Sequence, residues 1–289
     1  MTAPLLSVLI PAYNQPAGVE RLLAGVCVMA GHAAPGAVEV LVSDDSTDDV
    51  AAQRIEAACT ATPVQPAVRY RRQVPSLGAV PNWNHLLDQA RGRYVWLLHH
   101  DEEPDAPEVL AVLLAELGQP ECPDVFLLRC RVQHRPGSVP RLHFPPAWAA
   151  FMLGRWPGYL LRRNVIGPPS ALWIKRSVAV HYNPALVWLV DVEAYVRLRA
   201  GAGRVQAWSR AGVLSRVQAE LSITASLGRR REQIARYERL HIAQAGGASS
   251  TAAGAGFWLS DGFLTALPKA LETLLWWAWR VGQRLWPWR

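Results

Sequence analysis

The 289-residue sequence has few cysteines and lacks the signatures of several protein classes. Its four cysteines show neither CxxC spacing nor the density of a disulfide-rich secreted protein, so we expect a reducing, cytoplasmic environment. The first residues lack a basic region followed by a long apolar run, so no ordinary signal peptide is predicted. The chain has no helix-turn-helix, RRM, KH or zinc-finger pattern, and we therefore expect no nucleic-acid partner.

Acidic residues are scarce relative to basic ones. The formal net charge is +7, and most of the basic residues are arginines, which suit phosphate groups and anionic membranes alike. Charge alone does not separate these two kinds of partner. Hydrophobic residues make up 51% of the chain, which is enough to bury a sizeable core, so the composition indicates a globular protein.

Short apolar runs alternate with helical patterns in the first half of the chain. Leu5 to Ile10 and Val38 to Val42 are typical of buried strands, and the apolar stripe that begins at Val19 predicts a helix between them. The alternation then repeats over Val68–Arg71, Asn84–Ala90, Tyr94–Leu98 and Ala106–Leu117. It predicts an α/β fold with a Rossmann-like, mostly parallel sheet, flanking helices and ligands at the carboxyl ends of the strands.

The alternation weakens after Asp124. Prolines and tryptophans crowd the stretch from Pro136 to Pro169, which we expect to form long loops over one face. Helices are predicted over Asp191–Arg199 and Leu227–Ala243.

Polar side chains gather where three of the expected strands end. These segments are Pro11-Ala12-Tyr13-Asn14, Asp44-Asp45-Ser46-Thr47-Asp48 and His99-His100-Asp101-Glu102-Glu103. Strand ends of an open α/β sheet meet in one crevice, where acids suit a cation or the donors of a base and ribose. A structural alternative is that Asp44, Asp45 and Asp48 cap the next helix.

Together these segments resemble the family-2 glycosyltransferases. The resemblance spans roughly Leu5 to Ser226 and rests on Ser7 to Asn14, Val38 to Asp48, Gly78 with Asn82-Trp83-Asn84, and the acidic cluster after Leu98. It implies a GT-A fold whose crevice holds a nucleoside diphosphate sugar. No G-x-G-x-x-G follows the first strand, which disfavours a dinucleotide.

The resemblance implies a set of donor-side contacts. The residues expected to contact the nucleotide sugar are Pro11, Ala12, Tyr13, Asp44, Asp45, Arg71, Gly78, Asn82, His100 and Arg216. Either Asp44 or Asp45 would meet the base, because the glycine that the family usually has after its paired aspartates is missing. Arg216 stands in the segment where the family has a histidine or arginine that touches the diphosphate.

A metal ligand is also implied. A departing nucleoside diphosphate develops negative charge, which a divalent cation stabilises. Mg²⁺ or Mn²⁺ prefers oxygen and needs only one or two protein carboxylates. By resemblance Asp101 would hold this cation, with Glu102 as a candidate helper. The family's acidic motif is Asp-x-Asp, and here its first position is His99, which we expect to be structural and assign no metal role.

The acceptor side follows from the same resemblance. Inverting transfer needs a base that takes the proton of the acceptor hydroxyl. Asp191 matches that base and follows an apolar run, which would raise its pKa. It could also cap the helix that starts there, and Glu193 is the alternative base. Gly167 and Ser170 match a Gly-x-Pro-Ser loop beside the acceptor, although such a loop can also be an ordinary proline turn.

The C-terminal part has a different composition. Residues 246–256 are Gly, Ala and Ser apart from Thr251, which predicts a flexible linker. Residues 257–289 predict an amphipathic helix with basic residues and boundary tryptophans, too interrupted by charge to span a bilayer. We expect it to lie on an anionic membrane surface. Packing against the catalytic domain or a dimer partner is the alternative, and no oligomeric state is predicted.

The full sequence-based prediction is one GT-A domain in two halves. Residues 1–125 would bind the nucleoside diphosphate sugar donor and residues 126–245 a glycan or lipid-linked acceptor. The predicted function is inverting, metal-dependent glycosyl transfer at the inner face of the cell membrane, by a peripheral cytoplasmic enzyme. Two rivals are a nucleotidyltransferase and a degenerate sugar-nucleotide-binding or scaffold protein.

Overall fold

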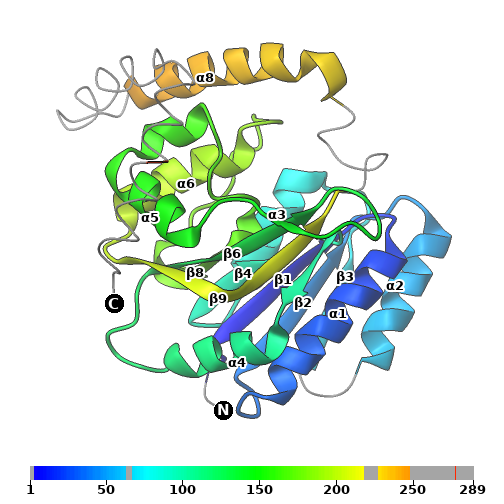
Figure 1. Cartoon of the computed structure of the whole chain (residues 1–289). Coiled ribbons are helices and arrows are strands. Elements are labelled where there is room, and N and C mark those ends of the chain that lie inside the picture. Colours follow the sequence, from blue (N-terminus) through cyan, green and yellow to red (C-terminus); the bar gives the residue numbers. More distant parts are fainter. Residues whose placement is uncertain (1–2, 63–66, 218–226, 248–276, 278–289) are drawn as a thin grey trace.

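The computed structural model describes residues 3–62, 67–217, 227–247 and 277, and a nine-stranded sheet organises them (Figure 1). The strand order is β3 (Ala67–Arg72), β2 (Val38–Asp44), β1 (Leu6–Ala12), β4 (Tyr94–Leu97), β8 (Leu172–Lys175), β6 (Val125–Gln133), β9 (Val205–Arg216) and β5 (Glu102–Asp105), with β7 (Arg141–Leu142) paired to β6. Strands β1, β2, β3, β4, β6 and β9 point the same way, whereas β5, β7 and β8 run opposite to them. This confirms the predicted α/β fold with a mostly parallel sheet.

Helices cover both faces of the first half of this sheet (Figure 1). On one face, Val8 and Ile10 of β1 join a core with α1 (Pro16–Gly31), α2 (Asp49–Ala61) and α4 (Pro107–Glu116). On the other face, Leu9 packs in a second cluster with Leu86 of α3 (Ala79–Gln89). Because both faces are covered, every residue of β1 and β2 is buried, which explains the apolar runs Val8–Ile10 and Val40–Val42 at their centres.

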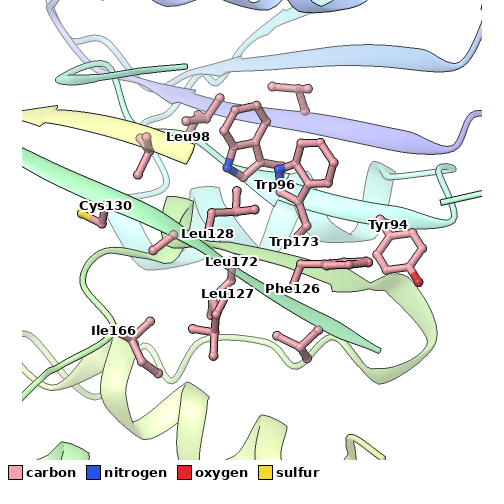
Figure 2. Close-up of a cluster of buried hydrophobic side chains, with 14 of the residues drawn as sticks. Tyr94, Trp96, Leu98, Phe126, Leu127, Leu128, Cys130, Ile166, Leu172 and Trp173 are labelled. Atoms are coloured by element: carbon pink, nitrogen blue, oxygen red, sulfur yellow. The ribbon is translucent and has the colours of Figure 1, made fainter. Parts of the chain in front are cut away.

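The centre of the sheet carries the largest buried side chains (Figure 2). Trp96 of β4 and Trp173 of β8 meet edge to face with their ring centroids 5.5 Å apart. The Trp96 indole N–H donates to the carbonyl oxygen of Ser170 at 2.7 Å. Phe126 and Leu128 of β6 close this core beside them. The core therefore ties the strand that precedes His99 to the 167–171 loop of the second half.

The second half is more regular than the sequence predicts. The stretch expected to be long loops contains α5 (Pro146–Arg155) and the short 3-10 helices η1 (Pro157–Leu161) and η2 (Pro169–Ala171). Pro146 is the first residue of α5, where a missing N–H costs nothing because the first turn has no intrahelical acceptor for it. The prolines of this stretch therefore begin helices as well as forming turns.

Two helix starts also differ from prediction. Helix α3 begins at Ala79, five residues before the expected Asn84, because Pro81 lies in its first turn, where the missing N–H is tolerated. Helix α6 (Val190–Gly201) begins one residue before Asp191, and Leu189 is its N-cap. Asp191 is therefore a first-turn residue, and the N-cap position itself belongs to Leu189.

The chain continues beyond β9 into α8 (Arg231–Gly247), which follows the 3-10 turn η4 (Gly228–Arg230) and lies across α5 and α6 (Figure 1). The first two residues of the predicted linker, 246 and 247, are thus helical. The rest of the linker and, apart from Trp277, the predicted 257–289 helix lie outside the described residues. Among the helices that are described, none is long and apolar enough to cross a membrane.

Candidate functional site

The loops that follow β1 and β2 are joined at the sheet's carboxyl edge. The backbone N–H of Asp45 donates to the carbonyl oxygen of Ala12 at 2.9 Å. Pro11 and Ala12 still belong to β1 and are buried, whereas Tyr13 is 48% exposed with its hydroxyl 3.3 Å from Thr47 Oγ1. Of the three residues expected along the nucleoside, Tyr13 is thus the one that offers a side chain to solvent.

The paired aspartates organise this edge. Asp44 is fully buried, and its Oδ2 accepts from the Tyr70 hydroxyl at 2.9 Å while Oδ1 accepts from the Ser46 N–H at 3.0 Å. Asp48, in contrast, accepts from the Val50 N–H at 2.9 Å and caps α2. The capping alternative therefore holds for Asp48, while Asp44 fixes the loop from inside the fold.

Asp45 holds the approach to α3. Its carboxylate accepts hydrogen bonds from Ser76 Oγ at 2.8 Å, Leu77 N–H at 2.6 Å and Gly78 N–H at 2.8 Å. Gly78 has a φ of +84°, a left-handed conformation that favours glycine. The structure thus brings Asp45 and Gly78 together, as expected for one donor-side loop cluster.

The remaining donor-side positions on β3 and α3 differ in accessibility. Asn82 is buried, donates from Nδ2 to the Ser43 carbonyl oxygen at 3.0 Å, and has a buried Oδ1 without a partner among the described residues. Arg71 is exposed at the end of β3. Asn84 makes a reciprocal pair of bonds with the Tyr182 backbone, at 2.7 and 2.8 Å, and so fastens α3 to the second half.

His99 lies between the acids of the two halves. Its N–H and its ring Nδ1 both face Glu102 Oε2, at 2.8 and 3.3 Å, and its ring meets Trp83 edge to face at 4.8 Å. Burial lowers the pKa of His99, but the charges of Glu102, Asp101 and Asp191 outweigh burial and raise it above its ordinary value. His99 is thus a packed, carboxylate-held residue that senses Asp101 and Asp191 together.

Asp101 is suited to hold a cation. Burial, with the charge of Glu102, raises its pKa to about 6, against a hydrogen bond from its own backbone N–H. A half-buried carboxylate of this kind gains from a divalent cation, which needs one or two protein carboxylates. Glu102, the candidate helper, accepts a hydrogen bond from the His99 N–H through Oε2 at 2.8 Å. No group of three or more His, Cys, Asp or Glu side chains arranged for a metal occurs in the described ranges.

Two further donor-side candidates lie next to Asp101. Burial, with the charge of His99, lowers the pKa of His100 to about 4, so its imidazole is neutral at neutral pH. The N–H of Arg216 donates to the Asp101 carbonyl oxygen at 2.8 Å, which brings β9 to this loop. The Arg216 guanidinium, however, is paired with Glu103 and Gln133. A phosphate would therefore compete with Glu103 for it.

On the acceptor side, Asp191 is held by the 164–167 loop. Its Oδ2 accepts from Asn164 Nδ2 at 2.8 Å, and its Oδ1 accepts from the Val192 N–H at 2.8 Å. The same Asn164 accepts from the N–H groups of Ile166 and Gly167 and donates to the Gly167 carbonyl oxygen. Burial raises the pKa of Asp191 to about 6 against these hydrogen bonds, as a general base near neutral pH requires.

The other acceptor-side candidates have structural surroundings. Arg197 donates to both carboxylate oxygens of Glu193, at 2.6 and 2.8 Å, so Glu193 is already held in an ion pair. Gly167 has a φ of +104°, and an added Cβ would lie 3.2 Å from Cys130 Sγ. Ser170 is fully buried, and its Oγ has no partner in the described part of the chain. Gly167 and Ser170 are both buried and therefore support the loop from its inner side.

A cleft of about 640 Å³ opens beside Asp191 and Asn164. It is lined by α3, η1, the segment 184–192 and α8, with Pro168 and Pro169 of the acceptor loop at its wall. The structure thus joins Asp191 to a cavity that the sequence does not reveal. Asn164 and Glu238 support the residues of this cleft, through contacts to Asp191 and to residues 187–189. The sequence gives no sign of either contact, because the partners lie 27 and about 50 positions apart.

Comparison with known proteins places this geometry in a family. The family model described as glycosyl transferase family 2 matches residues 7–171. An uncharacterized protein, MT1568, of Mycobacterium tuberculosis is 31% identical over 215 residues, which are 68% of this chain and 62% of that protein. The chain thus spans less than two thirds of this relative's length.

Solved structures share the fold at low sequence identity. TarS residues 1–349 of S. aureus, in complex with UDP-GlcNAc, has a TM-score of 0.58 and 17% identity, covering 76% of this chain and 60% of that one. The mannosyltransferase PcManGT of Pyrobaculum calidifontis, in complex with GDP-Man and Mn²⁺, has a TM-score of 0.50 and 16% identity, covering 100% and 89%. With the family model matching more than half of its residues, the chain belongs to glycosyl transferase family 2.

Proposed function

We propose that this protein transfers a sugar from a nucleoside diphosphate sugar to a glycan or lipid-linked acceptor, with inversion and with a divalent cation, at the inner face of the cell membrane. The observation that carries the proposal is Asp191, half-buried at a cleft, with a pKa raised by burial to about 6 and an orientation set by Asn164. The nucleotide sugars bound to TarS and PcManGT, and the Mn²⁺ of the latter, support the donor and the cation.

The proposed chemistry divides between the two sides. The acceptor oxygen attacks the anomeric carbon of the donor, the bond to the diphosphate oxygen breaks, and the acceptor proton passes to the Asp191 carboxylate. Asp101 is the residue that would hold Mg²⁺ or Mn²⁺, which when bound stabilises charge on the departing diphosphate. Tyr13 and the loops held by Asp45 would receive the nucleoside. Asn164 keeps the Asp191 carboxylate aimed and ionisable.

Two paired substitutions test this function. Asp191→Asn keeps size and can still accept one hydrogen bond, so donor binding and melting temperature should hold while turnover falls roughly 10²- to 10⁴-fold, as for loss of a general base. Asp101→Asn should instead abolish Mn²⁺-dependent affinity for nucleoside diphosphate, since an amide is a poorer ligand for a hard cation. Calorimetry with UDP and GDP, and nucleoside diphosphate release with acceptor membranes, separate the two effects.

Several outcomes would contradict the proposal. Near wild-type turnover of Asp191→Asn would move the base to Glu193. Unchanged Mn²⁺-dependent affinity of Asp101→Asn would remove Asp101 from the site. Release of pyrophosphate would indicate nucleotidyl transfer, and binding without turnover over a broad donor and acceptor panel would indicate a degenerate binding protein.

A further inference from the structure

The lining of the cleft beside Asp191 is predominantly apolar. Trp83 and Val80 from α3, Leu160 from η1, and Leu186, Val187 and Trp188 from the segment before α6 face it. Sugar hydroxyls are strongly hydrated, and burying one without a hydrogen-bond partner costs free energy. Walls of this kind offer such partners at few points. They instead favour a ligand that buries apolar surface against them.

The polar groups of the cleft form a small set. Asn164 and Asp191 are hydrogen-bonded to each other at 2.8 Å and make one polar spot in the lining. Arg162 and Arg239 also line the cleft, and Arg239 is fixed by donating from Nε to the Leu161 carbonyl oxygen at 3.0 Å. One carboxylate beside an apolar wall suits a ligand with one reacting hydroxyl and an apolar remainder.

The segment that forms the apolar wall is held in place. Glu238 of α8 accepts hydrogen bonds from the backbone N–H groups of Val187, Trp188 and Leu189, at 2.6, 3.2 and 2.7 Å. These contacts leave the Val187 side chain 52% exposed at the cleft. The wall is therefore preformed: Val187 is exposed at the cleft, Leu186 is packed behind it at 2% exposure, and Glu238 satisfies the N–H groups of residues 187–189.

We propose that the acceptor is a lipid-linked molecule, whose hydroxyl lies at Asp191 and whose apolar chain lies along Val187 and Trp188. The inference rests on the proposed function, because it takes Asp191 as the base, and it chooses the lipid-linked class over a free glycan. The apolar wall both binds such an acceptor and disfavours a fully hydroxylated one, since the latter would lose hydration there.

The experiment compares two probes that differ in their apolar part. The full-length protein is titrated with n-octyl β-D-glucoside, below its micelle concentration, and with methyl β-D-glucoside, and binding is followed by saturation-transfer NMR in the presence of UDP or GDP. We expect the octyl probe to bind at least about tenfold more tightly, since each buried methylene contributes favourably. Val187→Gln should remove most of this preference. Val112→Gln on α4, where the valine is 47% exposed and far from the cleft lining, is the matched control and should retain it.

Three results would overturn the inference. They are equal binding of both probes, octyl binding that is insensitive to Val187→Gln, and failure of the octyl probe to bind because a segment of the chain itself fills the cleft. The proposed function is read separately, from nucleoside diphosphate sugar binding and turnover. If the protein turns over the donor but shows no preference for the octyl probe, only the lipid-linked acceptor is contradicted. If it prefers the octyl probe but does not bind the donor, only the proposed glycosyltransferase function is contradicted.

Discussion

At the residue scale, the charge of Asp191 decides when the proposed base can work. A base must be ionised to take a proton, so kcat/KM should rise as pH increases through about 6, the value to which burial raises the Asp191 pKa. Asn164 opposes the increase in the Asp191 pKa, because its Nδ2–H stabilises the charged carboxylate. The acid limb of the pH profile therefore reports on this hydrogen bond.

Asn164→Ala removes the donor and should move the acid limb to higher pH by roughly one unit, the low end of what one hydrogen bond to a charged group contributes. At pH 8, where Asp191 is ionised in either protein, the loss of activity should be smaller than at pH 6. Profiles of kcat/KM for both proteins measure the shift. A uniform loss at every pH would show that Asn164 shapes the loop only, without tuning Asp191.

The sequence predicts where a residue lies when that residue is at the end of a predicted strand. Asp44 ends β2, and Asp45 and Asp101 lie in loops that follow strands, so a predicted sheet already brings them to one edge. Asn164 and Glu238 have no such signal, because a side chain that supports another through a distant backbone segment leaves no spacing pattern. The ion pair of Arg216 with Glu103 is hidden for the same reason. The ion pair of Glu193 with Arg197 has i,i+4 spacing on one helix and was not considered from the sequence.

At the element scale, α8 fixes the start of α6. The carboxylate of Glu238, 3% exposed, is the acceptor for the N–H groups of residues 187–189, and Leu189 is an N-cap without a side-chain cap of its own. Asp191 lies two residues beyond this contact. A glutamine would present one oxygen and an NH₂ group to donors, leaving buried N–H groups unsatisfied.

Glu238→Gln should therefore destabilise the protein by about 1 to 3 kcal/mol, the cost of unsatisfied buried donors. Because the substitution misplaces Asp191, kcat should fall while affinity for nucleoside diphosphate is kept. Denaturant unfolding, steady-state kinetics and a UDP or GDP titration measure the three effects. Glu56→Gln, at an exposed helical glutamate of α2, is the matched control and should change none of them. Equal stability of the two variants would show that α8 does not hold α6.

Elements were predictable in the first half and less so in the second. Strands β1, β2 and β4 are buried throughout and contain apolar runs, whereas β3 contains three arginines, and the amphipathic stripe of α1 has helical spacing. Strand β9 has a different signature, because it contains Gly212, where an added Cβ would lie 1.8 Å from the Arg129 carbonyl oxygen. That glycine sits where the β6 and β9 register shifts after Leu128, a bulge that breaks the alternation expected of a strand.

At the scale of the whole molecule, the remaining prediction concerns residues 257–289, which apart from Trp277 lie outside the described residues. The sequence there predicts an amphipathic helix with basic residues, and α8, whose Arg239 lines the cleft, precedes it in the chain. A lipid-linked acceptor would be met at a membrane surface, so the cleft and the predicted helix concern the same proposed substrate. Every donor-side candidate precedes residue 218, so truncation of the C-terminal segment removes none of them.

Truncation after Gly256 should therefore separate membrane binding from donor binding. Flotation with anionic vesicles of phosphatidylglycerol and phosphatidylcholine should show the bound fraction fall by about tenfold or more, because several basic residues near the surface are lost, each contributing favourably. Affinity for UDP or GDP with Mn²⁺ should be unchanged. A full-length variant with Lys269, Arg280 and Arg284 replaced by glutamine tests the contribution of charge alone. It should lose the part of vesicle binding that depends on anionic lipid and keep the part that depends on its tryptophans. If the truncated protein still floats, the membrane contact lies in residues 1–256. The 257–289 segment would then pack on the catalytic domain or a second copy. A changed melting temperature or oligomeric state of the truncated protein would reveal this packing.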